Sequence, residues 1–152
     1  MSLNTDIIQL REITPDNFED VLALKVKNGQ ESFVSTTAYA VAQALAYRDT
    51  AYPFAVYAGE TCVGFIMFGF YKDRDQHTLW KFMIDERYQG LGYGKAALIS
   101  GIEKMKAELG FCELYTGVVL GNSVAEGLYT SLGFEPTGLV ENGMRELRYT
   151  CR

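Results

Sequence analysis

The chain contains little cysteine, proline or histidine. Its 152 residues include three cysteines, three prolines and a single histidine. Cys62, Cys112 and Cys151 form no C-x-x-C pair, so their spacing indicates neither a zinc site nor a disulfide framework, and we expect no metal. Unpaired thiols are typical of a reducing compartment, and we therefore expect a cytoplasmic protein.

Long apolar runs and a basic surface are also missing. No stretch approaches the ~20 apolar residues that a membrane-spanning helix needs, and the N-terminus shows no signal-peptide pattern, so we expect no membrane association. The 19 acidic residues outnumber the 14 basic ones, for a net charge of −5. Nucleic-acid binding needs the opposite balance, so we expect no nucleic-acid partner. Most of the excess acid lies in residues 1–80, which hold 10 acidic and 6 basic residues, and this half of the chain could attract a cation.

What is present suits one globular unit. The composition is 48% hydrophobic and 22% charged, which is ordinary for a soluble protein, and 152 residues are enough to bury a core. We therefore predict a single domain over residues 1–152.

Apolar periodicity and turn residues predict a strand, two helices, three strands, a helix, a strand, a helix and two strands (βααβββαβαββ). This order predicts an α/β fold with a mixed sheet. The fourth and fifth strands are joined by a helix, so they should run parallel. Residues 71–77 read as a polar loop, in which His77 would be a solvated turn residue rather than a catalytic base. The expected strands cover 7–13, 54–57, 62–70, 79–84, 113–119, 135–137 and 145–150. The first expected helix begins after Pro15, and the other three cover about 36–47, 95–109 and 123–131.

A glycine-rich segment links the fourth strand to its helix. It reads Gln89-Gly90-Leu91-Gly92-Tyr93-Gly94 and is followed by Lys95. Glycines at alternate positions let backbone N–H groups converge beside a helix N-terminus, which predicts a site for a phosphate or pyrophosphate. The segment is not a Walker loop, because Gln89 replaces its first glycine and Ala96 its Ser or Thr. It also lacks the third glycine of the dinucleotide fingerprint, and a glycine-rich turn without a ligand is the alternative.

The pattern Gln-x-x-Gly-x-Gly resembles the pyrophosphate loop of the GNAT family of N-acetyltransferases. A later segment resembles that family's second cofactor segment: Asn122, a short helix, Tyr129 and then Gly133-Phe134. The resemblance implies acetyl-CoA as co-substrate. It also implies a mostly antiparallel GNAT-like sheet, with the parallel fourth and fifth strands splayed to admit the pantetheine arm between flanking helices.

The same resemblance implies roles for individual residues. Tyr129 would protonate the departing CoA thiolate, a task that suits a phenol because it keeps its proton at pH 7. A core aromatic is the alternative for Tyr129, and Lys95 is as well explained by starting a helix as by touching a phosphate. The implied cofactor-binding residues are Phe82, Met83, Ile84, Gln89, Gly90, Leu91, Gly92, Tyr93, Gly94, Lys95, Asn122, Ala125 and Tyr129.

The general base is less clear. Many polyamine-acetylating relatives carry a carboxylate early in the fourth strand, but here residues 79–81 read Leu-Trp-Lys. Glu31 is the next candidate base, because the connector between the first two helices usually borders the acceptor site. An exposed loop acid is the alternative for Glu31, and a water chain is the alternative base.

The acceptor is suggested by a closer likeness. Residues 30–34 and 64–69 are similar to the bacterial spermine/spermidine N-acetyltransferases, which implies transfer of acetyl to a primary amine of a polyamine by direct attack in a ternary complex. The aromatics Phe33, Tyr39 and Tyr71 would line an acceptor cleft or belong to the core. A peptide or protein N-acetyltransferase, or an acetyl-CoA-binding sensor without turnover, remain alternatives. Relatives are often dimers, so a homodimer is an expectation.

Overall fold

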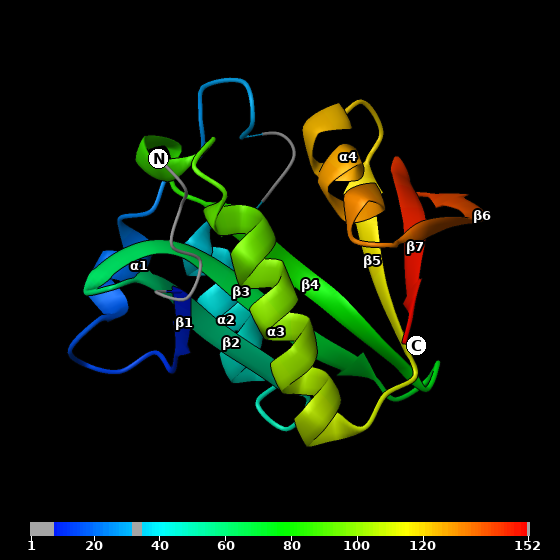
Figure 1. The fold of residues 1–152 in the computed structure, drawn as a ribbon. Helices are drawn as coiled ribbons and strands as arrows, with labels where there is room; N and C mark the ends of the chain where they lie inside the picture. The colour runs from blue at the N-terminus through cyan, green and yellow to red at the C-terminus, as the bar shows by residue number, and fades with distance from the viewer. Residues whose placement is uncertain (1–7, 32–34, 152) are drawn as a thin grey trace.

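The computed structural model describes residues 8–31 and 35–151, and Phe33 therefore lies outside the described part. Its seven strands form one sheet in the order β1-β2-β3-β4-β5-β7-β6 (Figure 1). The elements are β1 (Ile8–Arg11), α1 (Phe18–Leu22), α2 (Thr37–Ala46), β2 (Ala51–Ala58), β3 (Thr61–Tyr71), β4 (Gln76–Ile84), the short 3-10 helix η2 (Glu86–Tyr88), α3 (Tyr93–Leu109), β5 (Glu113–Val119), α4 (Ser123–Ser131), β6 (Glu135–Glu141) and β7 (Met144–Thr150).

Turn and cap residues fix the ends of these elements. Gly59 turns the β2–β3 hairpin with a φ of 62°, a conformation that costs glycine little. Thr36 caps α2 by accepting a hydrogen bond from the backbone N–H of Tyr39 at 3.1 Å. Gly110 ends α3 in the left-handed conformation that commonly closes helices.

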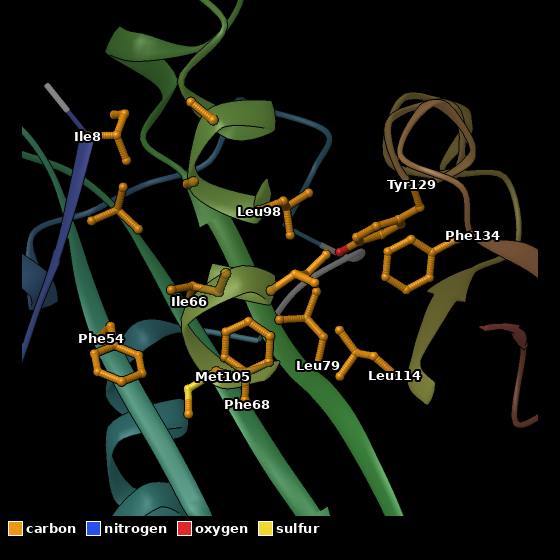
Figure 2. Packing of buried hydrophobic residues seen from close by; sticks show 14 of the residues in the cluster. Ile8, Phe54, Ile66, Phe68, Leu79, Leu98, Met105, Leu114, Tyr129 and Phe134 are labelled. Carbon is orange, nitrogen blue, oxygen red and sulfur yellow. The ribbon is translucent and has the colours of Figure 1, made fainter. Parts of the chain in front are cut away.

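The sheet separates two layers of helices, each with its own apolar cluster. Leu98, Ile102 and Met105 of α3 pack with Ile66 and Phe68 on one face, together with residues of α4, β5 and β7 (Figure 2). On the other face, the residues packed together are Val21, Leu24, Ala40, Ala51, Ala55, Tyr57, Phe65, Met67 and Met83. Strand β4 contributes residues to both clusters, so side chains pack against it on both faces of the sheet.

The pairing of β4 with β5 is unusually short. The two strands are parallel, but their ladder covers only Thr78 with Tyr115 and Leu79 with Thr116. Beyond these pairs they diverge toward α4, as Figure 1 shows. The predicted α/β fold, its element order, its mostly antiparallel sheet and the splay of the two parallel strands are all confirmed.

Some predicted boundaries were wrong. β4 begins at Gln76, so His77 lies in a strand and not in a solvated turn. Its ring packs between Phe70 and Phe111, at centroid distances of 4.7 and 5.4 Å. The error arose because residues 73–77 are polar, whereas cross-strand pairing with Phe70 extends the hairpin through them. Burial lowers the pKa of His77, although Asp75 opposes the shift.

Candidate active site

A cavity of about 550 Å³ opens where β4 and β5 diverge. Its walls come from the α1–α2 connector, β4, the glycine-rich loop, β5 and α4. A volume of this size fits a drug-sized ligand or the arm of a cofactor. The lining residues include nine of the predicted cofactor-binding residues: Phe82, Met83, Ile84, Gln89, Gly90, Gly94, Asn122, Ala125 and Tyr129.

A β-bulge shapes the β4 wall. In the β3–β4 ladder, Leu79 pairs with Phe68 and Lys81 with Met67, so Trp80 is the extra residue. The indole of Trp80 lies against Gly69, where an added Cβ would come within 1.9 Å of the ring. Gly69 is therefore required for this placement.

The glycine-rich loop has the geometry of an anion site. Gly90 and Gly92 have φ angles of 78° and 86°, in the left-handed region. Gly92 is also the N-cap residue of the 17-residue helix α3 and has no capping side chain. Free N–H groups and the helix dipole therefore meet at the loop, an arrangement that favours phosphate oxygens.

Gln89 ties this loop to its surroundings. Its Nε2 donates to the carbonyl oxygen of Ile84 at 2.9 Å and to Oε1 of Gln30 at 3.1 Å. The loop is therefore anchored to the end of β4 and also to the α1–α2 connector.

Asp85 provides a second anchor and is 1% exposed. It accepts hydrogen bonds from the backbone N–H groups of Lys25 and Arg87 and from the guanidinium of Arg87. Burial alone would raise the pKa of Asp85, but these bonds outweigh it and the pKa is lowered. The carboxylate therefore stays charged and locks the end of β4 to the chain after α1.

Tyr129 projects from α4 toward β4, beside Phe134 (Figure 2). Its side chain lines the cavity and is buried, and burial raises the pKa of Tyr129 to about 12, with a hydrogen bond to Thr116 acting in the opposite direction. The phenol is therefore protonated at neutral pH. A thiolate held in the same apolar site would also have a raised pKa, so burial does not by itself oppose proton transfer to it.

Asn122 is the N-cap residue of α4. Its Oδ1 accepts a hydrogen bond from the backbone N–H of Ala125 at 3.3 Å. The cap uses the carbonyl oxygen, so the Nδ2 amide group is the part that can donate to a ligand.

Lys81 was not predicted as a site residue, yet its ammonium-bearing side chain lines the cavity and is buried. Its Nζ lies 3.2 Å from Oγ of Ser35. Burial lowers the pKa of Lys81 to about 8. A signal existed in the sequence, since Lys81 interrupts an otherwise apolar run at residues 79–84.

The remaining predicted residues lie beside the cavity rather than in its wall. Leu91, Gly92, Tyr93 and Lys95 belong to the loop and the first turn of α3, and Lys95 is exposed. Glu31 is exposed in the α1–α2 connector, where its carboxylate accepts a hydrogen bond from the backbone N–H of Gly29 at 2.7 Å. Its role as a base stays a prediction.

A second cavity of about 290 Å³ adjoins the first. The two share Leu79, Trp80, Thr116, Gly117 and Met144. The second cavity combines aromatic rings with charged groups, which are Tyr71, Trp80, Tyr115, Glu141, Glu146 and Arg74. By contrast, the described lining of the first cavity contains no aspartate or glutamate.

Two kinds of feature are absent from the described residues. No helix in residues 8–31 or 35–151 is long and apolar enough to cross a membrane. In the same part of the chain, no three histidine, cysteine or carboxylate side chains are grouped so as to hold a metal ion.

Comparison with known proteins identifies the family. The profile described as "Acetyltransferase (GNAT) family" matches residues 10–134, and the chain belongs to this family. The chain is 33% identical over 140 residues to a protein of Bacillus subtilis (strain 168) named spermine/spermidine N(1)-acetyltransferase, over 86% of this chain and 90% of the relative.

Solved structures share the fold. PaiA N-acetyltransferase from Thermoplasma acidophilum, crystallised with coenzyme A, superposes with a TM-score of 0.71 at 16% identity, over 95% of this chain and 99% of that one. A Bacillus subtilis acetyltransferase in complex with CoA gives a TM-score of 0.67 at 20% identity, over 95% and 98% of the two chains.

Proposed function

We propose that the protein transfers an acetyl group from acetyl-CoA to a primary amine of a polyamine, by direct attack in a ternary complex. The observation that carries the proposal is the juxtaposition of a glycine-rich helix N-terminus and a buried, protonated Tyr129 along one cavity between splayed strands. The pyrophosphate binds the Gly90–Gly92 turn and the start of α3. The pantetheine arm then follows β4 past Asn122, which brings the sulfur to Tyr129.

Catalysis in this arrangement has three parts. Binding both substrates in one cavity makes the attack effectively intramolecular. Backbone groups of residues 82–84 orient the thioester carbonyl. Tyr129 gives its proton to the sulfur as the C–S bond breaks, so that the leaving group is a neutral thiol.

The second cavity supports a polyamine as acceptor. Tyr71, Trp80 and Tyr115 offer aromatic faces, and Glu141 and Glu146 offer carboxylates, which together suit a distal ammonium group. The cavity joins the first one at Trp80, so one extended molecule can fill it and still present its other amine to the thioester. The names of the curated relatives point to the same substrate class.

The test is release of free CoA from acetyl-CoA with spermine, spermidine, a diamine, an aminoglycoside and a short peptide assayed in parallel. Turnover restricted to the polyamines is expected. Turnover with the peptide alone would indicate a peptide N-acetyltransferase instead. Tight acetyl-CoA binding without turnover would instead favour a sensor.

A further inference from the structure

We propose that Lys81 is the proton acceptor that converts the acceptor's ammonium group into the attacking amine. The inference rests on the proposed function and supplies the base that the fourth strand otherwise lacks. It also moves the role of base away from Glu31, which is exposed and outside the cavity lining.

The first observation is the placement of the Lys81 amine. The residue is 6% exposed, lines the same cavity as Tyr129, and comes from the β4 segment beside the bulge. Within the described residues its hydrogen-bond partner is a neutral hydroxyl, that of Ser35 at 3.2 Å. Buried lysines normally sit beside a carboxylate, so a buried amine bonded to a hydroxyl needs a different explanation.

The second observation is the charge around Lys81. From the described elements, the cavity receives Lys27 of the α1–α2 connector and the neutral groups of Thr116, Asn122 and Tyr129, with no carboxylate. Across Trp80, the second cavity contributes Glu141, Glu146 and Arg74.

Asp85, the residue that follows β4, is already bonded to Arg87 and to the backbone of Lys25. Desolvation is accordingly the cause that lowers the pKa of Lys81 to about 8, and the described lining of the cavity offers no carboxylate to oppose it. A bound cationic acceptor would strengthen this effect, since it adds like charge and removes water.

The chemistry balances with the groups present. Neutral Nζ takes one proton from the acceptor's ammonium, and the freed lone pair forms the C–N bond at the thioester carbonyl. The C–S bond then breaks, and Tyr129 gives its proton to the sulfur. The second proton released from nitrogen returns to the Tyr129 phenolate, while Lys81 loses its proton to solvent before the next turnover.

A lysine suits a polyamine acetyltransferase for a physical reason. The pKa of a carboxyl group lies far below that of the acceptor's ammonium group. The pKa of a lysine ammonium remains much closer to it, even when burial has lowered it. Each pKa unit between the base and the ammonium group makes the proton-transfer equilibrium about tenfold less favourable. Deprotonation of the acceptor is therefore less unfavourable with an amine base than with a carboxylate.

The experiment compares Lys81→Met with Lys81→Arg. Methionine keeps the apolar stem without an amine, and arginine keeps a positive charge that does not deprotonate near neutrality. For the wild-type enzyme, kcat/KM with spermidine should rise with pH through an inflection near 8. We expect both variants to lose about 100-fold or more in kcat at pH 7.5 and to lose this inflection, with acetyl-CoA affinity within about threefold. Lys106→Met, an exposed change on α3, is the matched control.

Two results would overturn the inference. If Lys81→Arg retains kcat, the residue acts through charge or packing. If both variants keep the wild-type pH profile, the base is elsewhere, and Glu31→Gln becomes the variant to examine.

A second readout separates this inference from the proposed function. Competitive labelling with acetic anhydride, followed by peptide mass spectrometry, measures the titration of Lys81 without any acceptor. Titration near pH 8 is expected, and titration near the ordinary lysine value of 10.5 overturns the inference even if polyamine turnover is found. Absence of turnover in the wild type refutes the polyamine proposal by itself, and the labelling result then decides whether Lys81 is a depressed base.

Discussion

The side-chain amides of Gln30 and Gln89 form a reciprocal pair. Nε2 of Gln89 donates to Oε1 of Gln30 at 3.1 Å, and Nε2 of Gln30 lies 3.4 Å from Oε1 of Gln89. This pair joins the loop that would hold the pyrophosphate to the α1–α2 connector, which also lines the cavity. Cofactor affinity should therefore depend on a residue far away in the sequence.

We predict that Gln30→Ala weakens acetyl-CoA binding by about fivefold, which corresponds to the ~1 kcal/mol net worth of one such interaction. The loop loses its tie to the connector while keeping the bond from Gln89 to Ile84. Isothermal titration calorimetry measures the change, with Gln9→Ala on β1 as the control. Equal affinities for Gln30→Ala and wild type would show that the pair does not order the loop.

Gly92→Ala tests the anion site. A Cβ at a φ of 86° costs about 1–2 kcal/mol, and it also stands where a phosphate would approach the backbone. Gly110→Ala is a matched control, because Gly110 has a φ of 69° at the opposite end of α3. Thermal unfolding should show a similar loss of stability for both variants, and acetyl-CoA affinity should fall about tenfold or more for Gly92→Ala alone. A similar loss of affinity in both would attribute the effect to the helix and not to the loop.

Tyr129→Phe removes only the hydroxyl that faces the cavity. If this group protonates the thiolate, kcat should fall by about 10²–10³-fold, while acetyl-CoA affinity stays within about threefold. Tyr149→Phe is the control, since Tyr149 also packs against Phe134 but is not among the residues that line the cavity. Steady-state kinetics and calorimetry separate the two quantities. An unchanged kcat would mean that Tyr129 is a packing residue.

If the second cavity binds the distal ammonium group, changes in its lining should alter the KM for spermidine and leave kcat nearly unchanged. Glu141→Gln and Glu146→Gln each remove a negative charge at a distance from the reacting sulfur. We expect the KM for spermidine to rise about fivefold or more per variant with kcat nearly unchanged, because a screened ion pair is worth about 1 kcal/mol. A monoamine lacks the distal ammonium and provides the control. An equal rise in KM for the monoamine would argue against a distal ammonium site.

Lys81→Met should stabilise the protein in a pH-dependent way. The pKa of Lys81 is about 8 in the folded protein against 10.5 for the ordinary side chain, so below pH 8 the folded state carries the full cost of a buried charge. Between these values the unfolded state binds more protons, so the cost falls as pH rises and is gone above 10.5.

The variant should therefore exceed wild-type stability by about 2 kcal/mol at pH 7, and by progressively less toward pH 10. Urea unfolding at several pH values measures the difference. A difference that does not vary with pH would indicate that Lys81 does not titrate in this range.

Local signals in the sequence were sufficient to predict the elements and the glycine-rich turn between β4 and α3. The periodicity of residues 113–119 and 123–131 predicted β5 and α4 with the bounds that the structure has. The expected glycine turn also lies where the sequence placed it, between β4 and α3, with Gly90 and Gly92 at positive φ angles. These features are local, because turn conformation and helix starts depend on neighbouring residues.

His77 and Lys81 show where sequence reasoning failed. The polar residues around His77 suggested a solvated turn, but pairing with Phe70 on β3 placed its ring between two aromatics. In the sequence, Lys81 attracted attention only because no acid stands at residues 79–81. Its burial involves Ser35 and Met67 of the neighbouring strand β3, and both residues are distant in sequence.

The sequence by itself therefore determined the element order, the glycine-rich loop and the family resemblance, since each depends on short-range spacing. The tertiary structure decided which side chains share a cavity. The splay of β4 from β5 after only two paired positions, and the bulge at Trp80, depend on contacts between segments far apart in the chain. A cavity exists only between such segments, so its lining, the lack of carboxylates among its described residues and the buried amine of Lys81 became visible only with the fold.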